Sequence, residues 1–250
     1  MAGRGSRFQK EGFLLPKPLI PVHGIPMIHW VIKNLRPSDQ SHRFIFICLK
    51  SHLEQFDLLE KLKSWAPQCE VVITDSVTQG AACTVLLAKE WINDGHPLMI
   101  ANSDQWIDVD IQKFLCAIDQ GDVDGNIMTM KATDPKWSYV RLDDHRQVVD
   151  VVEKKVVSDE ATVGIYHFGH GRDFVTSAET MIAQNLRVNG KFYVAPVNNQ
   201  LIMDKKKIGI WNIGREGNGM YGLGIPSDLR KFELLDVSRK TARRWMGERI

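Results

Sequence analysis

The sequence predicts an α/β protein with three layers, α/β/α, around a mostly parallel mixed central sheet. Two observations support this fold class. Over the first half of the chain, short buried apolar runs alternate with amphipathic helical patterns, which is typical of βα units. Over the second half, strand patterns follow one another across turns and extend the same sheet. With 250 residues, 44% of them hydrophobic, the chain is long enough for a sizeable core.

The first half supplies three central strands and the helices that connect them. Strands are expected at Phe44–Leu49, Glu70–Ile73 and Pro97–Ala101, and helices near Ile25–Leu35, Leu53–Lys63, Ala81–Trp91 and Ile111–Ile118. Ligands of such sheets bind beyond the carboxyl ends of the strands. The residues that follow each strand are therefore the first candidates for function.

The second half contains more strands than helices. Strands are expected near Ile127–Met130, Tyr139–Leu142, Val148–Glu153 and Val163–Phe168, followed by a helix near Phe174–Gln184, short helical structure over 192–202, a glycine-rich loop over 214–219 and a final helix that Pro226 opens. No internal repeat interrupts this order, so we expect a single domain over residues 1–250.

Bulk properties exclude several classes of protein. The formal net charge of +2 gives no overall preference for nucleic acid or a membrane surface, so anion recognition has to be local. The four cysteines form no C-x-x-C pair and follow no secretion signal, and no apolar run is long enough to span a bilayer. We expect a soluble, cytoplasmic protein with reduced thiols; whether it forms a homo-oligomer is left open.

The N-terminal segment, MAGRGSRF followed by LPKPL, has the residues needed to hold phosphate. Gly3 and Gly5 can adopt backbone angles closed to other residues, so main-chain N–H groups can approach an anion, and Arg7 and Lys17 supply positive charge. Pro16 and Pro18 flank Lys17 and are expected to hold its neighbours extended. A mobile basic N-terminus is the alternative interpretation.

This segment resembles the signature of the sugar-phosphate nucleotidyltransferases, whose fold is that of nucleotide-diphospho-sugar transferases. The resemblance implies that the loop residues Ala2, Gly3, Gly5 and Ser6 bind a nucleoside triphosphate, that Arg7 holds its β and γ phosphates, and that Lys17 reaches the reacting phosphoryl group. Family members begin with a hydrophobic strand before the loop. Because Met1 lies within one residue of the first glycine, we expect that strand to be absent or truncated.

A carboxylate follows the third central strand. Asn102 and Asp104 stand at the strand's carboxyl end, where a hard oxygen ligand can bridge Mg²⁺ to substrate phosphates. The family resemblance implies that Asp104 holds the catalytic Mg²⁺ and that Asn102 binds the nucleotide; a turn-forming aspartate is the alternative. The resemblance also implies that Gln79 and Gly80 recognise the base, because a glutamine amide can hydrogen-bond a base edge and the glycine lets the base approach the backbone; helix capping by Thr78 is the alternative.

Within the single domain, residues 1–120 are expected to form the nucleotide-binding half and residues 121–225 the acceptor-binding half. C-terminal helices are expected over 226–250. The resemblance implies that Glu153 binds a substrate hydroxyl, that Lys154 binds the acceptor phosphate, that Gly164 allows close approach of substrate and that Asn198 lines the acceptor site. A surface charge cluster is the alternative for the charged pair. One position departs from the family pattern. Gly222 stands where an aspartate is the second metal ligand, and Asn198, Asn199 or water could substitute for it.

The sequence therefore predicts transfer of a nucleoside monophosphate from a triphosphate to a small phosphorylated acceptor, with a sugar 1-phosphate for polysaccharide precursors favoured. Three alternatives stay open: a CTP-dependent enzyme with a phosphocholine-like or phospho-amino-acid acceptor, a non-catalytic nucleotide-sugar-binding homologue, and a glycosyltransferase. The last would use the Asp-x-Asp of Asp108 and Asp110, although an apolar helical run begins at Ile111 and favours helix capping there.

Overall fold

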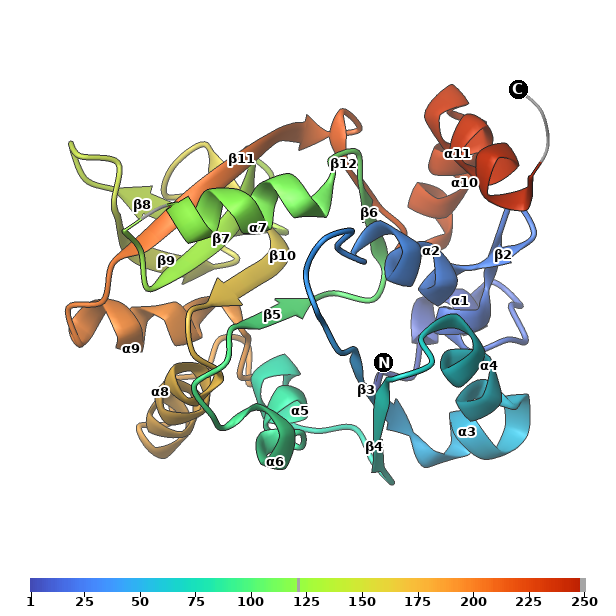
Figure 1. Cartoon of the computed structure of the whole chain (residues 1–250), viewed down its shortest axis with the longest axis horizontal. Coiled ribbons are helices and arrows are strands. Elements are labelled where there is room, and N and C mark those ends of the chain that lie inside the picture. The colour runs from blue at the N-terminus through green and yellow to red at the C-terminus, as the bar shows by residue number, and fades with distance from the viewer. Residues whose placement is uncertain (121, 248–250) are drawn as a thin grey trace.

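A mixed eight-stranded sheet forms the centre of the computed structural model, which describes residues 1–120 and 122–247 (Figure 1). Its strands are β5 (Leu98–Ala101), β6 (Gln105–Ile107), β7 (Gly125–Lys131), β8 (Ser138–Leu142), β9 (Val148–Glu153), β10 (Glu160–Phe168), β11 (Ile208–Glu216) and β12 (Gly219–Gly222). They run in the order β6-β12-β11-β7-β10-β8-β9, and β5 also pairs with β10. The expected boundary at residue 121 and the last three residues of the expected C-terminal helices lie outside the described residues.

Strand β10 organises this sheet. All nine of its residues are buried, and it pairs antiparallel with β5, β7 and β8. The pairs β7–β11 and β11–β12 are parallel, so the sheet is mixed. A second, two-stranded parallel sheet joins β3 (Ile45–Leu49) to β4 (Glu70–Thr74), with Cys48 opposite Ile73. The predicted mixed α/β fold class is confirmed, but two of the three strands predicted for the central sheet from the first half, β3 and β4, pair with each other in the smaller sheet.

Helices cover both faces of the large sheet and give the three expected layers (Figure 1). One face carries α7 (Ile111–Gln120), which packs on alternate residues of β7 such as Met128 and Met130; α3 (Lys50–Phe56) and α4 (Leu58–Trp65) flank the two-stranded sheet. The opposite face carries α5 (Ala81–Leu86), α6 (Lys89–Ile92), α8 (Gly171–Ala183), the 3₁₀ turn η2 (Ala195–Val197) and α9 (Asn198–Met203). Residues alternate between the two faces along each strand, as Ile127 and Met128 do.

The two ends of the chain pack together at one side of the molecule. The N-terminal elements are α1 (Ser6–Lys10), the 3₁₀ turn η1 (Lys17–Leu19), the hairpin β1 (Pro21–Val22) and β2 (Ile25–Pro26), and α2 (Met27–Asn34). They share a core with β6, β12, α10 (Pro226–Leu234) and α11 (Asp236–Met246), centred on the fully buried Trp30 and Phe232. This packing holds the N-terminal segment against the carboxyl end of β5.

Several predicted elements differ locally. The expected helix over 53–63 breaks at Asp57, which is left-handed with φ 50°, and the helix over 81–91 divides into α5 and α6. Lys17 starts a 3₁₀ turn after the extended Pro16, so the predicted extended stretch around it is wrong beyond that proline. The expected glycine-rich loop over 214–219 contains the end of β11 and the start of β12.

Within residues 1–120 and 122–247, no helix has both the length and the apolar character needed to cross a bilayer.

Candidate active site

An ion pair joins the N-terminal segment to the carboxyl end of β5. Lys17 Nζ lies 2.5 Å from Asp104 Oδ2, across 87 residues of sequence. Both side chains keep about a quarter of their surface exposed, 23% and 27%, so a ligand can reach the pair. The structure thus brings together the cation and the carboxylate that the sequence predicted at the reacting phosphates.

The glycine-rich loop packs directly against this lysine. Gly5 is left-handed, with φ 66°, and a Cβ at its position would lie 3.1 Å from Cβ of Lys17. Its carbonyl accepts hydrogen bonds from the N–H groups of Phe8 and Gln9, which start α1. A side chain at Gly5 would be strained and crowded, so the glycine allows the loop and the lysine to lie side by side.

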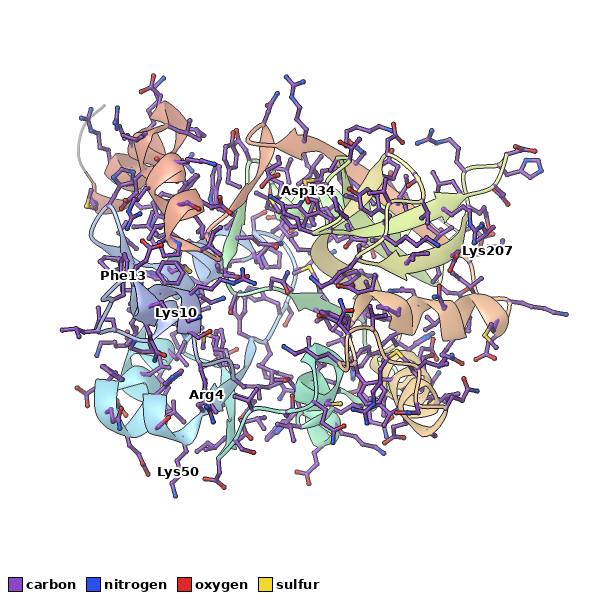
Figure 2. All side chains as sticks on the ribbon, turned by 180° about the vertical axis from the view of Figure 1, so that it is seen from behind. Arg4, Lys10, Phe13, Lys50, Asp134 and Lys207 are labelled. Atoms are coloured by element: carbon purple, nitrogen blue, oxygen red, sulfur yellow. The ribbon has the colours of Figure 1, made fainter. Side chains whose placement is uncertain are left out.

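Two arginines of the loop are exposed and lack bonded partners among the described residues. Neither Arg4 nor Arg7 forms a hydrogen bond or an ion pair in this part of the chain. Figure 2 shows Arg4 between Lys10 of α1 and Lys50 at the start of α3. Gly3 and Ser6 are also exposed, whereas Ala2 is buried against Leu49, so only its backbone can contribute to binding.

A pocket of about 450 Å³ opens beside the loop, at the carboxyl ends of β3 and β4. Its walls are Arg4, Gln9, Leu14, Pro16, Leu49, Ser51, His52, Gln55, Phe56, Asp75, Ser76 and Val77. Burial, together with the nearby N-terminal ammonium, lowers the pKa of His52, so this side chain is neutral at pH 7 and the positive charge of the pocket comes from Arg4. No sequence motif identified His52 as a candidate site residue.

The expected base-recognition residues have different surroundings. Gln79 is exposed and its side chain is available to a ligand. Gly80 faces the backbone of Phe192 instead of open space: a Cβ there would lie 2.2 Å from the Phe192 carbonyl oxygen. The requirement for glycine at this position thus comes from chain packing. The expectation that the missing side chain gives a base room is not supported by this geometry.

The same correction applies to Gly164 on β10. A Cβ at its position would lie 2.1 Å from Nδ2 of Asn102 and 3.1 Å from Oε1 of Gln105. The Asn102 amide therefore occupies the space that was expected to admit substrate. Asn102, the predicted nucleotide-binding asparagine, therefore packs against β10 at Gly164.

Two of the predicted acceptor residues, Glu153 and Lys154, lie at the end of β9. Glu153 is buried and accepts a short hydrogen bond from Ser138 Oγ, directly opposite on β8. Lys154 is exposed, left-handed with φ 56°, and places Nζ 5.6 Å from the ring centroid of Tyr193. Nearby, Tyr166 shares a 2.9 Å hydrogen bond with Thr162. Ser138, Tyr166 and Tyr193 were missed because nothing in their spacing links them to Glu153.

Burial raises the pKa of Glu153, although the Ser138 hydrogen bond and Lys154 act in the opposite direction. A carboxyl whose pKa is raised by folding stabilises the folded state most when protonated, and this contribution is lost as the pH rises through the raised value. The amide in Glu153→Gln does not ionise, so the variant does not lose stability in this way as the pH rises. Relative to the natural protein, we expect the variant to gain stability as the pH rises above about pH 4, where the glutamate of the unfolded chain begins to ionise. Urea unfolding at several pH values measures this; a difference that does not change with pH would contradict it.

Two asparagines considered as substitutes for a metal-binding aspartate have structural partners. Asn198 is fully buried and its amide donates to the Ala195 carbonyl 3.0 Å away. Asn199 exchanges two hydrogen bonds with the backbone of Val151. The Asn199 side chain is thus committed to Val151. Asn198 Oδ1 has no hydrogen-bond partner among the described residues, but the side chain is fully buried and presents no surface to an acceptor.

The Asp-x-Asp of the glycosyltransferase alternative starts a helix. Asp110 accepts the N–H of Gln112 at 3.0 Å and so caps α7, as its place before the apolar run predicted. This geometry favours the capping interpretation.

The residues at Asp104 fit a divalent cation. Among residues 1–120 and 122–247, no group of three or more His, Cys, Asp or Glu forms a complete protein cage. Mg²⁺ does not require one, because it commonly binds one or two carboxylates and completes its shell with substrate phosphates and water. Space beside Asp104 is kept by Gly224, where a Cβ would lie 2.8 Å from Asp104 Oδ2.

A family model described as nucleotidyl transferase matches residues 1–182. The chain belongs to this nucleotidyl transferase family. The mannose-1-phosphate guanylyltransferase catalytic subunit beta of Dictyostelium discoideum is 21% identical over 233 residues, which are 90% of this chain and 62% of that protein. The chain thus spans less than two thirds of the length of that curated relative.

Two solved structures show the same fold. A nucleoside-diphosphate-sugar pyrophosphorylase from Vibrio cholerae RC9 superimposes with a TM-score of 0.78 at 23% identity, over 94% of this chain and 98% of that one. An inositol-1-phosphate CTP transferase from T. maritima superimposes with a TM-score of 0.71 at 14% identity, over 100% of this chain and 95% of that one. This nucleotidyl transferase chain therefore has the architecture of these proteins.

Proposed function

We propose that this chain transfers a nucleoside monophosphate from a nucleoside triphosphate to a phosphate monoester, with a sugar 1-phosphate as the favoured acceptor. The observation that supports this most is the Lys17–Asp104 pair beside the glycine-rich loop. It provides a cation for phosphate and a carboxylate for Mg²⁺ at the same point. Family membership over residues 1–182 supports the same reaction class.

In the proposed reaction, an acceptor phosphate oxygen attacks the α-phosphorus and forms a new P–O bond. The bond from the α-phosphorus to the oxygen that bridges it to the β-phosphorus breaks, and pyrophosphate leaves with that electron pair. Arg7 would bind the β and γ phosphates, Lys17 the α-phosphate, and Lys154 the acceptor phosphate. Mg²⁺ held by Asp104 would neutralise charge on the phosphates. No protein nucleophile is needed, since such transfers depend on positioning and charge stabilisation.

A CTP-dependent transfer to another phosphorylated acceptor is the second candidate. Gly222 departs from the sugar-nucleotide pattern, and the fold is shared with a CTP transferase. We further propose a cytoplasmic location and a place in polysaccharide-precursor synthesis, because nucleoside triphosphates and phosphorylated sugars are intracellular metabolites.

A pyrophosphate-release panel tests the proposal. Each common triphosphate is paired with sugar 1-phosphates, phosphocholine and phospho-amino acids, with Mg²⁺ present. Release that depends on one triphosphate and one acceptor together would identify both substrates. Binding of a nucleotide sugar without release from any pair would instead favour the non-catalytic alternative.

A further inference from the structure

Ser138 holds one oxygen of the buried Glu153 carboxylate. The two residues lie directly opposite each other in the antiparallel β8–β9 pair. Opposite residues share a face of the sheet, with Cβ atoms about 4.5–5.5 Å apart, so a serine hydroxyl can reach the carboxylate. The Ser138 hydroxyl donates a short hydrogen bond to Glu153 Oε2. Because the two residues are only 8% and 9% exposed, water competes little for this bond.

This contact lies at the margin of an apolar core. Val140 and Val151, two positions away on β8 and β9, share a buried core with α8 and α9. A carboxylate buried beside apolar side chains costs free energy unless a donor compensates for the lost water. Burial raises the pKa of Glu153, and the Ser138 hydrogen bond and the charge of Lys154 oppose that rise. Ser138 thus supports the ionised form of the carboxylate.

The second oxygen of Glu153 is left for a ligand. Across residues 1–120 and 122–247, Oε1 forms no hydrogen bond. Lys154 and Tyr193 accompany it: Lys154 Nζ lies 5.6 Å from the Tyr193 ring centroid, and burial together with the charge of Glu153 raises the pKa of Tyr193. A carboxylate oxygen, an exposed ammonium and a half-buried phenol therefore lie close together on the acceptor side.

The start of β8 also fixes the residue that follows Glu153. Lys154 leaves β9 with φ 56°, and its N–H donates to the Trp137 carbonyl at 3.1 Å. Trp137 and Ser138 are neighbours in the chain. The same short segment therefore holds the main chain of Lys154 and the side chain of Glu153, while the Lys154 ammonium stays exposed.

Tyr166 is the remaining titratable group around this contact. Its hydroxyl shares a 2.9 Å hydrogen bond with Thr162. Burial raises the pKa of Tyr166, the Thr162 hydroxyl opposes this rise, the charge of Glu153 adds to it, and the Ser138 hydroxyl opposes it. The phenol is therefore protonated at neutral pH and lies beside both Ser138 and Glu153.

We propose that Ser138 is a positioning residue for acceptor recognition: it holds Oε2 of Glu153, so that Oε1 is left to accept a hydrogen bond from the acceptor. The recognised feature is an O–H or N–H donor, because an ionised carboxylate can only accept. The acceptor's part rests on the proposed nucleotidyl transfer, whereas the hold on the carboxylate can be measured in the free chain.

Carbon-13 NMR of the side-chain carboxyl tests this hold. The full chain is labelled with carbon-13 glutamate, and the Glu153 signal is assigned by its absence from Glu153→Gln. Ser138→Ala removes a donor that favours the ionised form, so the pKa of Glu153 should rise. Ser138→Thr keeps the hydroxyl and should return the pKa towards its natural value. Ser158→Ala is the matched control, because it removes a serine hydroxyl that donates to the Val140 carbonyl of the same strand at 2.5 Å.

Steady-state kinetics test the positioning role, with the triphosphate and acceptor that the panel identifies. Ser138→Ala should raise KM for the acceptor about tenfold, since a hydrogen bond to a charged group commonly contributes that much. KM for the triphosphate should not change. Adding Ser138→Ala to Glu153→Ala should raise the acceptor KM little further, because the serine acts through the carboxylate. Circular dichroism and thermal unfolding establish that each variant folds.

Several results would overturn the proposal. They are a Glu153 pKa or an acceptor KM that is unchanged in folded Ser138→Ala, equal changes in Ser158→Ala, no recovery in folded Ser138→Thr, and a full tenfold loss on top of Glu153→Ala.

Failure of the proposed function would give a different result. A natural chain that releases no pyrophosphate from any substrate pair would contradict the transferase proposal, and a Glu153 pKa that rises in Ser138→Ala alone would still support the hold on the carboxylate. Pyrophosphate release with natural KM values and an unchanged Glu153 pKa in Ser138→Ala would leave the transferase proposal standing and remove Ser138 from acceptor recognition.

Discussion

Lys17→Met is expected to lower the turnover number for pyrophosphate release by about 10² to 10³, the usual effect of removing one transition-state contact. The methionine keeps the apolar stem that packs against Gly5 but removes the ammonium. It also leaves the Asp104 carboxylate without the partner that lies 2.5 Å away. Steady-state kinetics and equilibrium binding of the triphosphate, measured on the same preparation, separate the loss of rate from the loss of affinity.

Lys10→Met is the matched control for this variant. Lys10 is exposed on α1, close to the same loop, and its loss changes the net charge by the same amount. Turnover should stay close to that of the natural chain. An equal fall in both variants would show that only the general positive charge of the N-terminal segment matters, and natural turnover in Lys17→Met would remove the lysine from the reaction.

Gly80→Ala is expected to cause the largest loss of stability among substitutions near the site. Gly80 has φ 149° and ψ 172°, a conformation almost restricted to glycine, and strain of this kind costs about 1–3 kcal/mol. The added Cβ would also meet the carbonyl oxygen of Phe192 at 2.2 Å and its nitrogen at 2.5 Å. Backbone shifts forced by such crowding cost about 1–3 kcal/mol more. Thermal unfolding measures the effect, at about 2–4 °C per kcal/mol for a protein of this size.

Gly12→Ala isolates the contact with Phe192. Gly12 also has a positive φ, 83°, but nothing lies within 4 Å of its Cβ position. Its substitution therefore adds backbone strain without a clash. We expect a clearly smaller fall in melting temperature than for Gly80→Ala, and equal falls would mean that the Phe192 backbone yields freely.

The sequence located the strands of the first half closely. The apolar runs at β3, β4 and β5 were predicted within one residue at each end, because short runs of β-branched and apolar residues are typical of strands. Burial differs among them: β3 is largely buried, whereas β4 and β5 are half-buried and Ile73 of β4 is exposed. Strands β11 and β12 were not predicted, since glycines between them indicated a loop. In the structure, Gly219 lets the two strands approach closely: a Cβ there would lie 1.8 Å from the Ile213 carbonyl oxygen.

The candidate site could be predicted in part. Lys17 and Asp104 were identified from their motifs and their places after a loop and a strand, but their contact depends on long-range packing of α2, β6 and α10. Asp228 stands in the first turn of the predicted final helix, where an acidic residue is common. Only the folded chain shows that the first turn of α10 lies beside Gly222.

The most direct measurement follows the α-phosphorus of the triphosphate. The chain is incubated with Mg²⁺, the triphosphate and acceptor that the panel identifies, and triphosphate labelled at the α or the γ position. We expect the α label to enter a diphosphate-linked product and the γ label to leave as pyrophosphate, both only when acceptor is present. Release of the γ label as inorganic phosphate, or transfer of the γ-phosphoryl group to the acceptor, would contradict nucleotidyl transfer.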